Sequence, residues 1–189
     1  MKDTFFHRHP QYIKYGMAFL ILLPGVLFSC TSHEPSRSKG ALAFNKEIRK
    51  TIKILAPLLI KPVAQGDVSA INALLNKTCR EAQKAGQPLT CGIVILDKNG
   101  VSLTGRYPKE SYKALNYSHY SAVAQALEKR KAIQARLFLQ DGTKFYVVLS
   151  PLILNGHVEG LLGIGYTVEE ASKRWGITEK EFLSLDFSN

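Results

Sequence analysis

The segment 133–166 constrains the fold most, because its side chains alternate with the two-residue period of β-strands. Apolar residues at 133, 135, 137 and 139 alternate with Gln134, Arg136, Phe138 and Gln140. Asp141-Gly142 and Asn155-Gly156 are dipeptides that favour tight hairpin turns. The segment therefore predicts three consecutive antiparallel strands joined by two hairpins.

Two-residue loops in both hairpins would place Arg136 opposite Val147 and Leu149 opposite Leu162. One face of the sheet, called here the glycine face, then carries Ile133, Ala135, Leu137, Tyr146, Val148, Leu161, Gly163 and Gly165. The other, called the arginine face, carries Gln134, Arg136, Phe138, Phe145, Val147, Leu149, Leu162, Ile164 and Tyr166. Because glycine lets a helix approach a sheet closely, we expect the N-terminal helices on the glycine face.

Two helices are predicted before the first strand. Apolar residues spaced by three and four indicate a helix over 45–64, with Asn45 as its N-cap and a kink at Pro57. Asp67 is placed to cap a second helix, which Gly86 ends. Together they form a long N-terminal helical spine.

The remaining elements complete an α+β fold. Asn99-Gly100 joins predicted strands at 90–96 and 101–106, and a helix follows over 118–130. Two short helices close the chain, one near 169–175 and one capped by Thr178 and Glu181. The prediction is a five-stranded antiparallel sheet with the helical spine on one face.

The N-terminus has the pattern of an export signal. Residues 1–14 are polar and basic, and the apolar run 15–28 is too short to span a bilayer as a helix. Leu27-Phe28-Ser29-Cys30 resembles the bacterial lipobox, which predicts a signal peptide over 1–29 and acyl chains such as palmitate on Cys30. The alternative is a plain signal anchor in which Cys30 has no role. Residues 30–40 then form a flexible tether, and 41–189 a single domain with a helical tail.

Export decides the class of partner more than charge does. The formal net charge is +10 over 189 residues, and it is +8 without residues 1–29. Such an excess favours nucleic acid or an anionic surface as a partner, but an exported lipoprotein does not meet nucleic acid. We expect a lipid-anchored protein of the cell envelope that faces the periplasm or exterior. Thr31 after the cysteine points to the outer membrane.

Cys79 and Cys91 remain as a pair in an oxidising compartment. They form either a disulfide or two buried free thiols. The sequence has no CxxC, CxxCH or HExxH motif, and no nucleophile–base arrangement with persuasive spacing. We therefore expect no metal, no cofactor and no enzymatic activity.

The order of elements resembles a single Cache domain, an extracytoplasmic relative of PAS domains. The motifs that carry the resemblance are Gly92–Gly100, Lys144–Leu152 and the glycine-rich Val158–Tyr166. The resemblance implies a pocket for a small metabolite, often a carboxylate, amino acid or amine, between the sheet and the connection after the second strand. No second apolar span or output module follows Tyr166, so a signal would have to pass through a partner protein.

Arg136 is the first candidate for a ligand contact, because a guanidinium on an apolar face needs an anion or hydrogen-bond partners. The alternative is that Arg136 pairs with a local glutamate or lies at the solvent end of the sheet. Phe138 and Tyr166 are further candidates, because they share the predicted face of Arg136. Arg106 and Tyr107 are candidates because they end the second strand, where the resemblance to Cache domains implies pocket residues. Tyr117 and Tyr120 are candidates because they lie in the connection that covers this face.

Two functions remain open. The first is a lipid-anchored Cache-like sensor that binds a small, anionic metabolite and signals through a partner protein. The second is a structural or assembly lipoprotein of the envelope that uses the same fold without a ligand.

Overall fold

The computed structural model describes residues 38–86, 91–106, 115–138 and 142–188. The predicted signal peptide, Cys30 and Tyr107 lie outside these residues. No helix in the described ranges is long and apolar enough to cross a membrane. All of the described residues belong to one compact unit, which spans residues 35–189.

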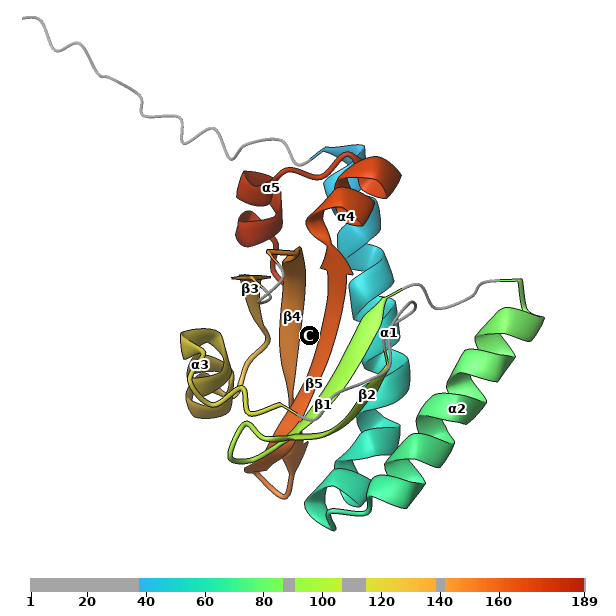
Figure 1. Cartoon of the computed structure of the whole chain (residues 1–189), viewed down its shortest axis with the longest axis vertical. Helices are drawn as coiled ribbons and strands as arrows, with labels where there is room; N and C mark the ends of the chain where they lie inside the picture. Colours follow the sequence, from blue (N-terminus) through green and yellow to red (C-terminus); the bar gives the residue numbers. More distant parts are fainter. Residues whose placement is uncertain (1–37, 87–90, 107–114, 139–141, 189) are drawn as a thin grey trace, which may run out of the picture. The chain divides into compact units, whose positions relative to one another are not determined.

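The predicted α+β fold with a five-stranded antiparallel sheet is confirmed (Figure 1). The strands pair in the order β2-β1-β5-β4-β3. The elements along the chain are α1 Lys39–Ala64, α2 Val68–Lys84, β1 Gly92–Asp97, β2 Ser102–Arg106, α3 Ser121–Lys129, β3 Ile133–Phe138, β4 Lys144–Leu154, β5 His157–Thr167, α4 Val168–Trp175 and α5 Glu179–Ser184.

The spine is the helix pair α1 and α2, and it starts earlier than predicted. Ser38, not Asn45, is the N-cap of α1, because its side chain accepts a hydrogen bond from the Ala41 N–H. Asn45 lies inside α1 and donates to the carbonyl of Asp186 in the C-terminal tail. Asp67 caps α2 as predicted, by accepting from the Ala70 N–H.

Both hairpins place β4 one residue away from its predicted register. Phe138 pairs with Lys144, whereas a two-residue loop would place it opposite Phe145. In the second hairpin the turn is as predicted, with Leu154 opposite His157, but Leu152 pairs with Gly160 because the register shifts at a bulge. A shift of one residue moves every side chain of a strand to the other face.

The two faces of the sheet are therefore composed differently from the prediction. Tyr146 and Val148 lie on the arginine face with Leu162, Ile164 and Tyr166, whereas Phe145, Val147 and Leu149 join the glycine face. The expectation that the spine covers the glycine face is wrong. α1 packs on the arginine face, where it buries the larger set of bulky apolar side chains.

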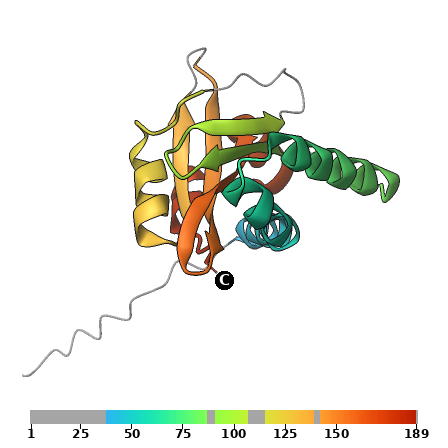
Figure 2. The same cartoon turned by 90° about the horizontal axis from the view of Figure 1, so that it is seen from below.

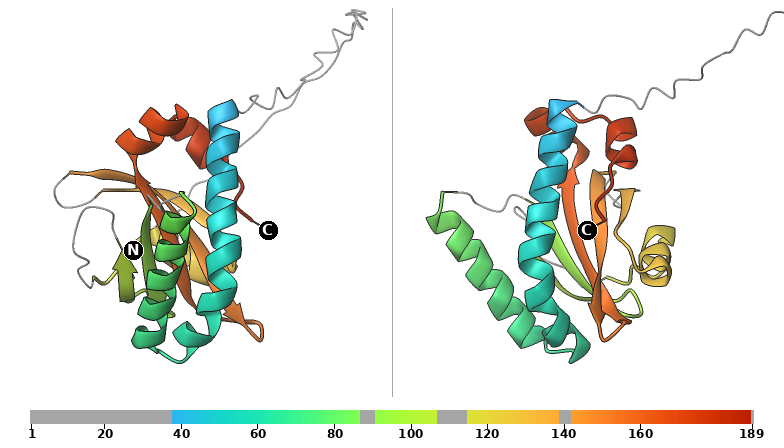
Figure 3. Two further views of the ribbon diagram at one scale, coloured as in Figure 1. Left: turned by 90° about the vertical axis from the view of Figure 1, so that its right-hand side faces the viewer. Right: turned by 180° about the vertical axis from the view of Figure 1, so that it is seen from behind.

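Two clusters of buried side chains result, one on each side of the sheet. Figure 2 shows α1 on one side and α3 on the other. The cluster on the arginine face contains the inner side of α1 and the C-terminal tail. Figure 3 shows α2 beside α1, with α4 and α5 near the N-terminal end of α1. The cluster on the glycine face is smaller, and it contains α3 and Tyr117.

Candidate functional site

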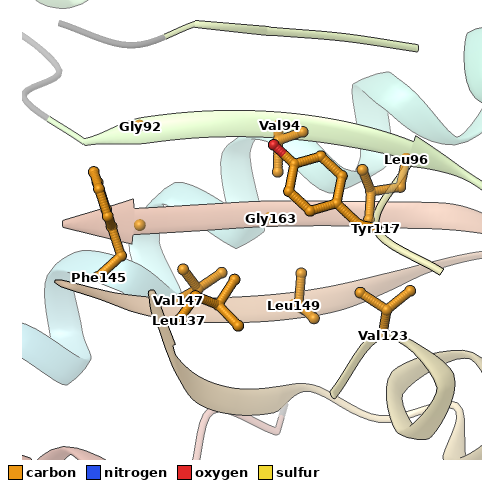
Figure 4. Close-up of a pocket in the computed structure, with 11 residues that line it drawn as sticks. Gly92, Val94, Leu96, Tyr117, Val123, Leu137, Phe145, Val147, Leu149 and Gly163 are labelled. Carbon is orange, nitrogen blue, oxygen red and sulfur yellow. The ribbon is translucent and has the colours of Figure 1, made fainter. Parts of the chain in front are cut away.

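A pocket of about 50 Å³ opens on the glycine face, between the sheet and the segment that carries Tyr117 and α3 (Figure 4). Side chains and backbone from β1, β3, β4, β5 and α3 contribute to its wall. The lining residues are Gly92, Val94, Leu96, Tyr117, Val123, Leu137, Phe145, Val147, Leu149, Gly163 and Gly165. This is the region that the Cache resemblance implies for a ligand, on the face opposite the spine.

Three glycines explain why the sheet is hollow at this place. Gly92 pairs with Gly165 across β1 and β5, and Gly163 pairs with Val94 beside them. These positions carry no side chain, so the neighbouring side chains lean over them. A Cβ on Gly163 would lie 2.5 Å from Cγ1 of Val94 and 3.3 Å from Cδ2 of Leu149. The pocket is small because these two side chains already occupy part of the hollow.

The lining of the pocket is almost entirely apolar. Among the described residues that line it, none is charged and Tyr117 alone has a polar side-chain group, its hydroxyl. Figure 4 shows the Tyr117 ring beside Val94, with its oxygen directed toward β1. Removing a charged group from water without a compensating partner is costly. The pocket therefore suits an uncharged group rather than a carboxylate.

The structure brings one of the predicted site residues to this pocket and a second one close to it. Tyr117 lines it, and Tyr120 packs on the same cluster with its ring centroid 6.1 Å from that of Tyr117. The His119 ring lies 4.2 Å from the Tyr120 ring. The connection between β2 and α3 therefore supplies part of the wall.

Arg136 and Phe138 lie on the arginine face of the edge strand β3, away from the pocket. The Arg136 guanidinium pairs with the carboxylate of Glu179 in α5 and lies 4.7 Å from the centroid of the Phe138 ring. This is the local glutamate of the alternative interpretation. The Phe138 side chain is exposed. The ligand role predicted for these two residues stays a prediction, and the pocket does not use them.

Tyr166 is also on the arginine face. Its ring is buried 5.7 Å from Phe44 and 5.0 Å from Trp175, so it belongs to the aromatic packing between α1 and α4. Arg106 ends β2, and its Nε is buried without a hydrogen-bond partner among the described residues. Neither residue lines the pocket.

Cys79 and Cys91 are free thiols in the structure, but only Cys91 is buried as the second predicted alternative expected, and Cys79 is half-buried. Burial raises the pKa of Cys91 to about 12, although a hydrogen bond with the Tyr166 side chain lowers it. A neutral thiol is a poor nucleophile and a poor metal ligand. In the described part of the chain no three His, Cys, Asp or Glu side chains could together hold a metal ion.

Most of the residues that line the pocket are not identifiable as site residues from the sequence. Val94, Leu96 and Leu149 have the pattern of buried strand residues, and Gly163 and Gly165 that of a surface for helix packing. The sequence signal for the pocket is the pair Gly163 and Gly165 in β5, together with Gly92 at the start of β1. Only the strand order, which places β1 beside β5, makes these three glycines neighbours.

No protein-family model matches the sequence, and the comparison with curated proteins also gives no match. Solved structures do match. The extracellular domain of a protein assigned as a histidine kinase has a TM-score of 0.55 at 13% identity, over 75% of this chain and 57% of its own.

Two other structures are more distant. A domain of a sensory box/GGDEF family protein from Vibrio parahaemolyticus has a TM-score of 0.48 at 16% identity, over 78% of this chain and 64% of its own. The ligand-binding domain of the Pseudomonas aeruginosa amino acid chemoreceptor PctC, solved with GABA, has a TM-score of 0.45 at 13% identity, over 71% of this chain and 58% of its own. This chain spans less than two thirds of each of the three. The fold is thus α+β and PAS/Cache-like, and it is similar to that of the extracellular domain of this histidine kinase.

Proposed function

We propose that the protein is an extracytoplasmic binding module that holds a small, uncharged ligand in the pocket on the glycine face. It passes the occupancy of this pocket to a partner protein and catalyses no reaction. Acyl chains on Cys30 hold it at a membrane of the cell envelope. The fold similarity to an extracellular sensor domain and the place of the pocket in that fold support this proposal.

The observation that carries the proposal is the composition of the pocket wall. A ligand there would contact four of the five strands, α3 and Tyr117 at the same time. Binding would therefore change the packing between the sheet and the segment that covers it. A partner protein that contacts this segment can sense such a change.

The chemistry of the wall supports an uncharged ligand over the anion expected from Arg136. The guanidinium of Arg136 has a carboxylate partner on the other face, and no cation lines the pocket among the described residues. The Tyr117 hydroxyl is a group that can orient a ligand by hydrogen bonding. An apolar molecule with one polar group fits this lining.

The size of the pocket sets a further condition. Typical ligand pockets enclose roughly 300–1,000 Å³, whereas this one has about 50 Å³. A ligand larger than a few atoms must displace the side chains that lean over Gly163. Val94 and Leu149 are the side chains that must turn.

Thermal-shift screening of the purified protein tests the proposal. Panels of uncharged aromatic and aliphatic compounds are compared with amino acids and carboxylates. At a ligand concentration of 100 Kd, we expect Tm to rise by roughly 5–10 °C for a domain of this size. A carboxylate that raises Tm while no uncharged compound does so would contradict the proposed ligand class.

A pair of variants on β3 locates the binding site. Leu137→Trp adds bulk to a half-buried side chain in the pocket wall and should abolish the ligand-induced rise in Tm. Phe138→Trp is the matched control, because Phe138 is the next residue on the same strand, is exposed and points to the other face. An equal loss in both variants would place the ligand elsewhere.

The second candidate function is a structural or assembly lipoprotein without a ligand. The small volume of the pocket favours it, because side chains of the protein itself nearly fill the glycine face. If no compound raises Tm and Leu137→Trp stabilises the protein by filling the hollow, this second function replaces the first.

A further inference from the structure

The outer side of α1 carries charge that the proposed function does not use. The ten exposed residues of α1, called here the α1 stripe, are Lys39, Leu42, Ala43, Lys46, Lys50, Lys53, Ile54, Pro57, Leu58 and Lys61. Seven of them, at positions 39, 43, 46, 50, 53, 57 and 61, are spaced by three or four residues, and the other three lie next to these, so the ten form one continuous face of the helix. Five of them are lysines and none is acidic.

The lysines follow the middle of the stripe, and large apolar side chains flank them. Leu42, Ile54 and Leu58 are 51%, 48% and 47% exposed. At a lipid surface, exposed apolar side chains can enter the boundary between headgroups and acyl chains while neighbouring lysines contact anionic headgroups. α1 has 26 residues and is therefore about 39 Å long, so the stripe covers one side of the domain.

The five lysines of the stripe outnumber the acidic residues described beside it, which are Glu47, Glu181 and Asp186. A groove lined by Lys46, Lys50 and Lys53 also contains Asp186. The Asp186 carboxylate accepts a hydrogen bond from the Ser188 N–H and interacts with Arg49, a further cation that lines the groove. Glu47, the acidic residue of α1, is half-buried and outside the stripe.

Charge also argues against a second copy of the chain as the partner of this face. In a twofold-symmetric contact the same patch faces itself, so the lysines of one stripe would face the lysines of the other. Like charges that face each other across an interface weaken it. An anionic surface is the complementary partner.

We infer that the α1 stripe docks on an anionic lipid bilayer. The inference goes beyond the proposed function and uses the predicted anchor only to bring the stripe close to the membrane. Eight residues separate Cys30 from Lys39, so the start of α1 lies within about 30 Å of an acylated cysteine. Juxtamembrane clusters of four to eight basic residues bind anionic leaflets in this way.

The test uses the full lipidated chain in vesicles of phosphatidylcholine, with or without an equal part of phosphatidylglycerol. A fluorophore is attached at Ala43→Cys in the stripe, or at Ala124→Cys as the matched control, in a Cys79→Ser background. Ala124 is also an exposed helical alanine, but it lies on α3 across the sheet. Quenching by lipids that carry a nitroxide on the headgroup reports how close each site lies to the surface.

We expect quenching at position 43 to exceed that at 124 several-fold in vesicles with phosphatidylglycerol. The excess should vanish in phosphatidylcholine alone and at 1 M salt, where the screening length falls to about 3 Å. Lys46→Gln, Lys50→Gln and Lys53→Gln together should abolish it. The control variant replaces three other exposed lysines, Lys77, Lys84 and Lys129, by glutamine. It has the same net charge as the triple variant of the stripe, and it should keep the excess quenching at position 43.

Two results would overturn the inference. Equal quenching at positions 43 and 124 in anionic vesicles would show that the stripe does not face the bilayer. Self-quenching between labels at position 43, independent of phosphatidylglycerol, would assign the stripe to a contact between two copies of the chain.

Discussion

Glu181 connects the two ends of the folded domain through one side chain. Its carboxylate accepts hydrogen bonds from the N–H and the hydroxyl of Thr178, and its own N–H donates to the Thr178 hydroxyl oxygen, which completes the capping box of α5. Hydrogen bonds with Ser38, the N-cap of α1, and then with Thr178 hold the pKa of Glu181 at about 2, below its ordinary value of 4.5. The N-caps of α1 and α5 thus both interact with one ionised carboxylate.

Glu181→Gln should lower Tm at pH 7 and weaken the pH dependence of stability in acid. Because the pKa of the folded state is the lower one, the Glu181 carboxylate stabilises the fold fully above pH 4.5. This contribution is lost as the pH falls from 4.5 toward 2. Thermal melts across this range should therefore show a smaller acid-induced loss in the variant than in the native chain.

Glu128→Gln is the control for this effect, because Glu128 is an exposed carboxylate on α3. It should leave the acid limb of the stability curve unchanged. If Glu181→Gln and the native chain lose Tm in parallel between pH 4.5 and 2, the contribution assigned to Glu181 is wrong.

The candidate site shows what residue type alone can indicate. Tyr117 is predicted as a pocket residue from its place in the connection, and it lines the pocket. Arg136 is a candidate because a guanidinium needs a partner, and that need is met by Glu179, 43 residues further along the chain. The sequence shows the need for a partner, but only packing determines which group supplies it.

At the scale of elements, the short α5 and the residues after it complete the core on the arginine face. Phe182 is fully buried, with its ring stacked 4.4 Å from Tyr146 and 5.9 Å edge-on from Phe44. Leu185 and Phe187 are buried in the same cluster. The tail is thus part of the core that holds α1 against the sheet.

Phe182→Ala should destabilise the domain by about 3–5 kcal/mol, because it removes a buried ring and leaves a cavity. Leu183→Ala is the neighbouring control and should change the free energy of unfolding by less than about 0.5 kcal/mol, because Leu183 is 46% exposed. Urea unfolding at pH 7 measures both. A loss below about 1 kcal/mol for Phe182→Ala would mean that the tail does not contribute to the core.

The β-hairpins show which properties of an element are local. Turn dipeptides and alternation locate β3, β4 and β5 correctly, because both depend on neighbouring residues. The bulge between Leu152 and Ile153 is not predicted, and it moves the apolar side chains of β4 to the other face. Bulges depend on how the strand packs against both neighbours, so the local sequence does not reveal it.

At the scale of the whole molecule, the structure shows where part of the excess positive charge lies. Five of the basic residues lie along one exposed face of α1, which follows the predicted tether directly. The same net charge spread evenly would indicate only solubility. Its concentration beside the predicted anchor is the reason why we infer a membrane, and not nucleic acid, as the partner of this charge.

Cys30→Ala should release the protein from the membrane fraction of a bacterial host. The native chain should carry acyl chains on an N-terminal Cys30. It should stay in the membrane fraction, because two or more acyl chains hold a protein stably on a bilayer. Mass spectrometry of the N-terminal peptide and cell fractionation measure both properties, with Cys79→Ala as the control. An intact, unlipidated N-terminus in the native chain would exclude the anchor.

The sequence by itself determined the class of each element and most of its ends. Asp67, Thr178 and the hairpin glycines act on residues within one turn, so their effect is readable locally. Only the tertiary structure decided which face of the sheet α1 covers and where the pocket lies. These depend on a one-residue shift in strand pairing, and that shift is set by contacts between residues far apart in the chain.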